Sequence, residues 1–172
     1  ATAPDAAPMK ETRHGSPWVF WVLAVLFLLQ SGAETWFASF DHEHIAFDIA
    51  ASALSALALA AIWTGAWALV SRLNIGSPRW TQHASIALAG YLFSWCAYNL
   101  VGAGAFAASM VLSWTLVTLT IMAVCSLLVL FRHLRVATRL KPSAAFVCAA
   151  ALPIAMCALT LTKLYSTEHG AD

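Results

Sequence analysis

The chain has 172 residues, of which 61% are hydrophobic and 10% charged, and its mean hydropathy is +0.76. A soluble domain is about half apolar and about a quarter charged, so this composition excludes one and predicts an integral membrane protein. The net charge of +1 gives no basic surface of the kind that nucleic-acid-binding domains carry, so we expect no nucleic-acid partner.

The first residues, ATAPDAAP, are rich in alanine and proline and predict a flexible cytoplasmic tail or linker over residues 1–16. The stretch from Lys10 to Ala33 also has the charges, apolar run and small residues of a signal peptide. We favour a retained membrane helix, because the apolar character continues through Trp36 and Phe37.

Five apolar runs are long enough to cross a bilayer, which takes about 20 residues. We expect these helices at about residues 18–38, 45–70, 81–101, 107–131 and 143–164, with Gly102-Ala103-Gly104 as the turn between the third and the fourth. The predicted fold is therefore an all-α bundle of five transmembrane helices over residues 17–166, followed by a short tail at 167–172.

The basic residues give this bundle an orientation. Those that flank the helices on one side are Lys10, Arg13, Arg72, Arg79, Arg132, Arg135, Arg139 and Lys141, and Lys163 is the exception. By the positive-inside rule the N-terminus is cytoplasmic and the C-terminus lies outside, as expected for a multi-pass protein of a bacterial inner membrane.

A cluster of titratable residues, FDHEH at 40–44, lies between the first two apolar runs. A second helix beginning by residue 41 would place Asp41, His44 and Asp48 on one face. These residues, with His42, would then suit a divalent metal such as zinc, or a histidine that exchanges protons. The simpler interpretation, which we favour, is an exposed acidic loop tip.

Four polar residues near the predicted outer side form a second candidate cluster: Glu34, Asp48, Asn99 and Lys163. Ionisable groups at membrane depth are costly and usually face a partner or water. We therefore expect Lys163 to form an ion pair with Glu34 or Asp48, with Asn99 nearby.

His83 and His133 are the histidines that could bind haem b, because both lie at the predicted cytoplasmic ends of helices. Both positions also suit ordinary interfacial histidines beside arginines, and we expect no cofactor. The cysteines form no C-x-x-C pair and lie in apolar runs, which predicts buried free thiols and no zinc or redox site: Cys96, Cys125, Cys148 and Cys157.

Small residues recur along the second apolar run at helical spacing. Ser52, Ala56 and Ala60 share one face, and Ala61 and Gly65 share another. Such faces let backbones approach closely in lipid. They predict that this helix is either the central packed element or the face that binds a partner protein.

The loop RHLRVATRLK, residues 132–141, carries a second pattern. If the helix continued through it, Arg132, Arg135 and Arg139 would form a stripe that, with Lys141, could bind anionic lipid headgroups. We favour a plain topology signal, which accounts for these charges without a ligand.

Four stretches resemble the membrane region of bacterial inner-membrane proteins with an N-terminal forkhead-associated domain: PWVFWVLAVLFLL (17–29), WTGAWALVSRL (63–73), RWTQH (79–83) and VLSW (111–114). The resemblance implies a cytoplasmic phosphothreonine-binding module ahead of a linker and a helical bundle. It carries over no phosphate-binding residue. A chain that begins at Ala1 rather than Met fits a trimmed initiator or a piece of a longer protein.

No hydrolase, kinase, nucleotide-binding or metalloprotease signature is present. We therefore expect a non-enzymatic anchor or assembly subunit that packs against other membrane proteins in the bilayer and tethers a cytoplasmic signalling domain. The alternative is a small transport, metal-handling or redox-complex subunit that uses the outer acidic and histidine residues.

Overall fold

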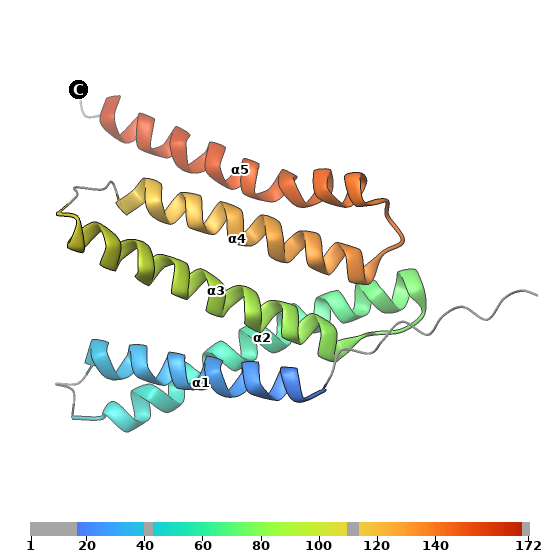
Figure 1. Ribbon diagram of the computed structural model, residues 1–172, viewed down its shortest axis with the longest axis horizontal. Helices are drawn as coiled ribbons and strands as arrows, with labels where there is room; N and C mark the ends of the chain where they lie inside the picture. Colours follow the sequence, from blue (N-terminus) through green and yellow to red (C-terminus); the bar gives the residue numbers. More distant parts are fainter. Residues whose placement is uncertain (1–16, 40–42, 110–113, 170–172) are drawn as a thin grey trace, which may run out of the picture.

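The computed structural model describes residues 17–39, 43–109 and 114–169, which form five α-helices and no strand (Figure 1). The helices are α1 Pro17–Ser39, α2 Ile45–Ile75, α3 Trp80–Ala107, α4 Trp114–Ala137 and α5 Pro142–His169. All five are long and apolar enough to cross a membrane. The expectation of an all-helical protein with five membrane-spanning helices is confirmed.

The boundary between α3 and α4 differs from the prediction. α3 continues through Gly102 and Gly104 to Ala107, and α4 begins at Trp114. Glycine is tolerated within membrane helices because the backbone bonds are satisfied internally. Gly102 lies beside the start of α4, since a Cβ there would contact the Trp114 indole at 3.4 Å. The expected turn at 102–104 is therefore wrong, and the chain leaves the helix after Ala107.

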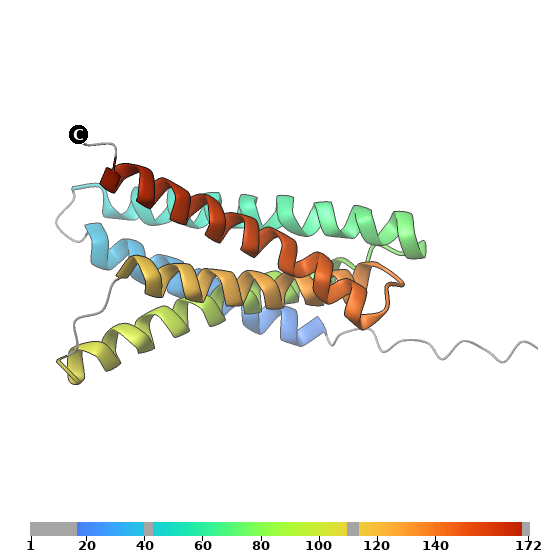
Figure 2. The same cartoon turned by 90° about the horizontal axis from the view of Figure 1, so that it is seen from above.

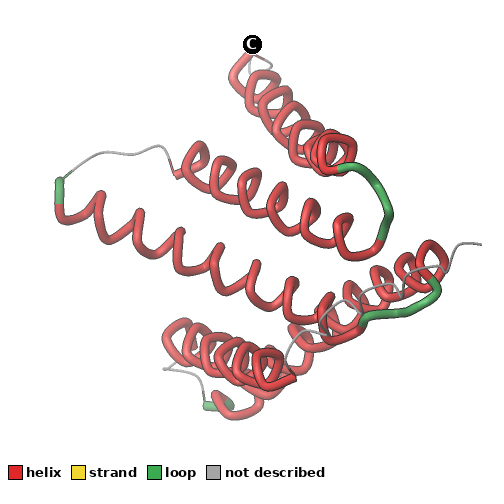
Figure 3. Tube along the Cα trace, turned by 45° about the vertical axis from the view of Figure 1, so that its right-hand side comes forward, coloured by secondary structure: helices red, strands yellow, loops and turns green. Residues whose placement is uncertain are grey.

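The helices form a layered bundle in which sequence neighbours pack against one another. α3 contacts α1, α2 and α4, and the α5 backbone packs on α4 (Figure 1). α2 crosses the others obliquely (Figure 3) and runs along one edge of the molecule when viewed from above (Figure 2). α1 packs on α2 and α3, so it is an integral part of the bundle.

The small residues of α2 have different surroundings. Ser52 faces α1, where its Oγ lies 3.5 Å from Ser31 Oγ, and a Cβ added at Gly65 would lie 3.7 Å from the Trp80 ring. Ala56 and Ala60 are half-buried and Ala61 is exposed. None of the most hydrophobic stretch of α2 is buried inside the chain, so α2 is less enclosed than a central packed element would be.

Candidate functional site

Two histidines face each other inside the bundle. His83 lies in the first turn of α3, His133 lies in the last turns of α4, and both side chains are fully buried. Their Nδ1 atoms are 2.9 Å apart, the rings differ in tilt by 23°, and the ring centroids are 5.2 Å apart. These values fit an N–H···N hydrogen bond between rings that meet edge to edge.

Two tryptophans of α2 complete this cluster. Trp63 Nε1 donates to His133 Nε2 over 3.0 Å. Trp67, one turn later, stacks on His133 with a centroid separation of 4.8 Å and an interplanar angle of 6°. The cluster of Trp63, Trp67, His83 and His133, called here the aromatic–histidine cluster, therefore joins α2, α3 and α4 through polar contacts.

The chain brings these residues together because they lie at similar depths in antiparallel helices. α2 ends at Ile75, where Gly76 adopts a left-handed φ of 83°, and α3 begins at Trp80. Two further contacts hold this end: Ser71 Oγ donates to the Ser77 carbonyl over 2.8 Å, and Arg79 donates to the Val136 carbonyl over 3.3 Å. The cluster thus lies at the end of the bundle that carries the arginine-rich connections.

The expectation of ordinary interfacial histidines is wrong for His83 and His133, because both are fully buried between helices. A haem site meets a geometric obstacle in this arrangement. A metal–nitrogen bond is about 2.0 Å long, so two nitrogens on opposite sides of an iron lie about 4 Å apart. The facing nitrogens are 2.9 Å apart, so the rings would have to separate to admit an iron.

The FDHEH segment, residues 40–44, does not have the helical start that the proposed metal site required. α2 begins at Ile45, so the shared helical face proposed for Asp41, His44 and Asp48 does not form. His44 is exposed, and its carbonyl accepts hydrogen bonds from the backbone N–H groups of residues 47 and 48. Asp41 and His42 lie outside the described residues. Within the described part of the chain, no three metal-binding side chains gather.

The four residues of the second candidate cluster lie on four different helices. Glu34 and Lys163 are both exposed, and their helices, α1 and α5, lie at opposite edges of the bundle in Figure 1. Asn99 donates to the Trp95 carbonyl of its own helix over 2.8 Å. Asp48 is half-buried on α2 and is the other expected partner of Lys163, and that ion pair stays a prediction.

The predicted stripe of Arg132, Arg135 and Arg139 required a helix that continues to residue 139. α4 ends at Ala137, so Arg132 and Arg135 lie on the helix, whereas Arg139 and Lys141 lie in the connection to α5. Arg135 donates to the Leu140 carbonyl over 3.2 Å. These charges lie at one end of the bundle, which both a lipid-headgroup site and a topology signal require.

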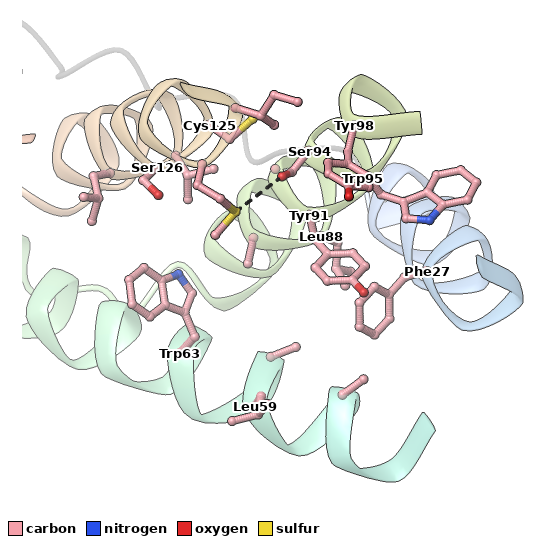
Figure 4. A pocket seen from close by; sticks show the side chains of 18 of the residues that line it. Phe27, Leu59, Trp63, Leu88, Tyr91, Ser94, Trp95, Tyr98, Cys125 and Ser126 are labelled. Atoms are coloured by element: carbon pink, nitrogen blue, oxygen red, sulfur yellow. Dashed lines mark hydrogen bonds between the residues drawn. The ribbon is translucent and has the colours of Figure 1, made fainter. Parts of the chain in front are cut away.

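A groove lies beside Trp63, one member of the aromatic–histidine cluster (Figure 4). It has a volume of about 690 Å³, and most of its lining comes from α2, α3 and α4. Trp63 belongs to both features, since its ring lines the groove while its N–H holds His133. The lining is apolar and aromatic, with a few hydroxyl groups: Leu59, Trp63, Tyr91, Ser94, Tyr98 and Ser126. Sequence reasoning did not anticipate this groove.

One buried amide was also missed. Gln30 of α1 is 6% exposed, and no described group lies within hydrogen-bond distance of its side-chain oxygen or nitrogen. Its neighbours Phe27 and Ser31 are also buried. A buried amide without a partner is unusual, so Gln30 is a second polar feature in the apolar interior.

The four cysteines are free. Cys125 is buried, Cys157 is half-buried, and Cys96 and Cys148 are exposed on the bundle surface. The sequence predicted that all four are buried, and this prediction is wrong for Cys96 and Cys148, which lie on the outer faces of α3 and α5.

Comparison with known proteins gives no relative. The chain matches no family model, no curated protein and no solved structure.

Proposed function

We propose that this chain is a non-enzymatic helical module of a bacterial inner membrane that acts as an anchor or assembly subunit and tethers a cytoplasmic signalling domain. One observation carries this proposal. The most hydrophobic stretch of α2 contains no residue buried within the chain, and α2 forms one wall of an open groove.

In lipid, helices associate through close packing and interhelical hydrogen bonds, because lipid tails are as apolar as the side chains. Atoms that line a groove lack dispersion partners on one side. The half-buried Ala56 and Ala60 offer a shallow face where a neighbouring helix could approach the α2 backbone. These features support a module completed by another membrane helix.

The charge distribution supports the orientation. Arg72, Arg79, Arg132 and Arg135 lie at the end of the bundle where α2 ends and α3 begins. α1 begins at this same end, because it runs antiparallel to α2. A domain attached ahead of α1 would therefore lie beside the basic connections, in the cytoplasm by the positive-inside rule.

The test is crosslinking in native membranes from a photoreactive residue placed in the groove. Substituting Leu59, which lines the groove, should give an adduct of one discrete mass with a protein. Leu54 of the same helix is 68% exposed and lies outside the groove lining, so substituting it is the matched control. Adducts with lipid alone from both positions would contradict the assembly role.

The buried pair His83 and His133 favours a second candidate, a redox or metal-handling subunit. Metal analysis and an optical spectrum of protein purified from native membranes separate the two candidates. Stoichiometric metal or a haem Soret band that is lost on His133→Asn would support the second candidate. A stable protein with neither would count against it.

A further inference from the structure

The aromatic–histidine cluster determines where its protons lie. The Trp63 indole N–H can only donate a hydrogen bond, so His133 Nε2 must accept it with a lone pair. A neutral imidazole carries one N–H and one acceptor nitrogen. The proton of His133 therefore lies on Nδ1, which faces His83.

The same argument extends to the second ring. His133 Nδ1–H donates across 2.9 Å to His83 Nδ1, which must be an acceptor. The proton of His83 then lies on Nε2. A further proton on either ring would set two N–H groups facing each other and break one of the two hydrogen bonds.

The surroundings also favour two neutral rings. The chain has no aspartate or glutamate between Asp48 and Glu168, so α3 and α4 carry no carboxylate that could balance a charged imidazole. The charged residues of α3, of α4 and of the end of α2 nearest the pair are all cations: Arg72 on α2, Arg79 before α3, and Arg132 and Arg135 on α4. Asp48, the acidic residue of α2, lies in the first turn at the other end of that helix.

One donor then remains without an acceptor. His83 is fully buried, and its Nε2 has no hydrogen-bond partner among the described residues. An unsatisfied N–H in an apolar interior is strongly unfavourable, because no water replaces the missing acceptor. We propose that His83 Nε2–H is a binding site for one hydrogen-bond-accepting oxygen atom. Because this nitrogen carries a proton, the site takes an oxygen acceptor and not a metal ion.

Two sources can supply such an oxygen, an enclosed water molecule or the ester or headgroup oxygen of a lipid. Enclosure favours water, since the Nε2 atom has almost no accessible surface. A lipid could reach this level through a pocket of about 320 Å³ lined by Thr64, Trp80, Thr81 and Ala84. Thr81 and Ala84 flank His83 on α3, so this pocket lies within one helical turn of the site.

The test is nuclear magnetic resonance of the full chain in lipid nanodiscs, with the histidine rings labelled with ¹⁵N. Near neutral pH we expect both rings to be neutral, with the proton of His133 on Nδ1 and that of His83 on Nε2. A His83 ring protonated on Nδ1, or a doubly protonated one, would overturn the proposal.

The His83 Hε2 proton also identifies the acceptor. A cross-peak to water supports the water source, and a cross-peak to lipid protons supports the lipid source. A downfield shift should accompany either. A Hε2 proton that shows no cross-peak and no downfield shift would overturn the site.

Two further measurements separate binding from folding. His83→Asn retains an acceptor oxygen near the former Nδ1 position, so His133 should keep its Nδ1–H while the His83 cross-peaks disappear. Zn²⁺ added to the wild-type chain should leave both rings unchanged, and coordinated shifts of both would overturn the protonated Nε2. The wild-type spectrum decides the question even where a variant does not fold.

Discussion

Gly90 of α3 lies directly against Val129 of α4, and a Cβ atom at Gly90 would overlap the Val129 side chain. This is the tightest helix–helix approach among the described glycines. The missing side chain lets the two backbones come close enough to hold His83 and His133 in contact along the same pair of helices.

Gly90→Ala should therefore lower the free energy of unfolding by about 1–3 kcal/mol, the usual effect of overpacking a well-packed site. Denaturing-detergent titration of the purified protein measures this change. Gly104→Ala is the matched control, because nothing lies within 4 Å of its Cβ position in the same helix. It should be neutral or slightly stabilising.

The double variant Gly90→Ala/Val129→Ala should recover part of the loss, since the shorter side chain makes room for the new methyl group. An equal loss in the single and double variants would show that the contact with Val129 is not the cause.

Trp63→Phe removes the indole N–H and leaves His133 Nε2 without its donor. A buried acceptor left unsatisfied costs about 1–3 kcal/mol, so the free energy of unfolding should fall within that range. Trp67→Phe is the control, since the Trp67 indole makes no hydrogen bond to the described residues and a phenyl ring keeps much of the stacking on His133. Equal losses for the two variants would indicate packing rather than hydrogen bonding.

The number and type of helices follow from the sequence because the length and hydropathy of a run decide whether it can cross a bilayer. The α3–α4 boundary did not follow. Gly102 and Gly104 resemble a turn when only neighbouring residues are considered. α3 continues through both glycines, because a helix in lipid satisfies its own backbone hydrogen bonds and no water competes for them. Gly102 lies beside Trp114 of α4, a neighbour that only the folded bundle brings to it.

The histidine cluster was harder to predict for a related reason. His133 is flanked by Arg132 and Arg135, so the local sequence suggests an interfacial surface. Its burial arises because α4 turns this position toward Trp67 of α2, whereas the arginines lie on other faces. The position of each histidine along its helix could be predicted from the sequence. The rotation of α2, α3 and α4 that turns these side chains toward one another could not.

Gln30→Met tests the unpartnered amide of α1. Replacing an unsatisfied buried polar group by an apolar one of similar volume should raise the free energy of unfolding by about 1–3 kcal/mol. Asn99→Leu, at an exposed amide on α3, should change it by no more than about 0.5 kcal/mol. A clear loss on Gln30→Met would show that the amide has a bound partner, such as water.

The orientation of the bundle predicts which connections face each compartment. His44 precedes α2 at one end, and Arg139 lies between α4 and α5 at the other, and both are exposed. Single cysteines at these positions, in a chain whose four native cysteines are replaced, should react differently with a membrane-impermeant maleimide. We expect His44→Cys to react in intact cells and Arg139→Cys only after permeabilisation, because the positive-inside rule predicts a cytoplasmic arginine-rich end. Reaction of both cysteines from the same side of the membrane would mean that one helix does not cross the bilayer.

The opposite labelling, with Arg139→Cys reactive in intact cells and His44→Cys protected, would place the aromatic–histidine cluster on the outer side. It would also remove the basis for a cytoplasmic domain ahead of α1.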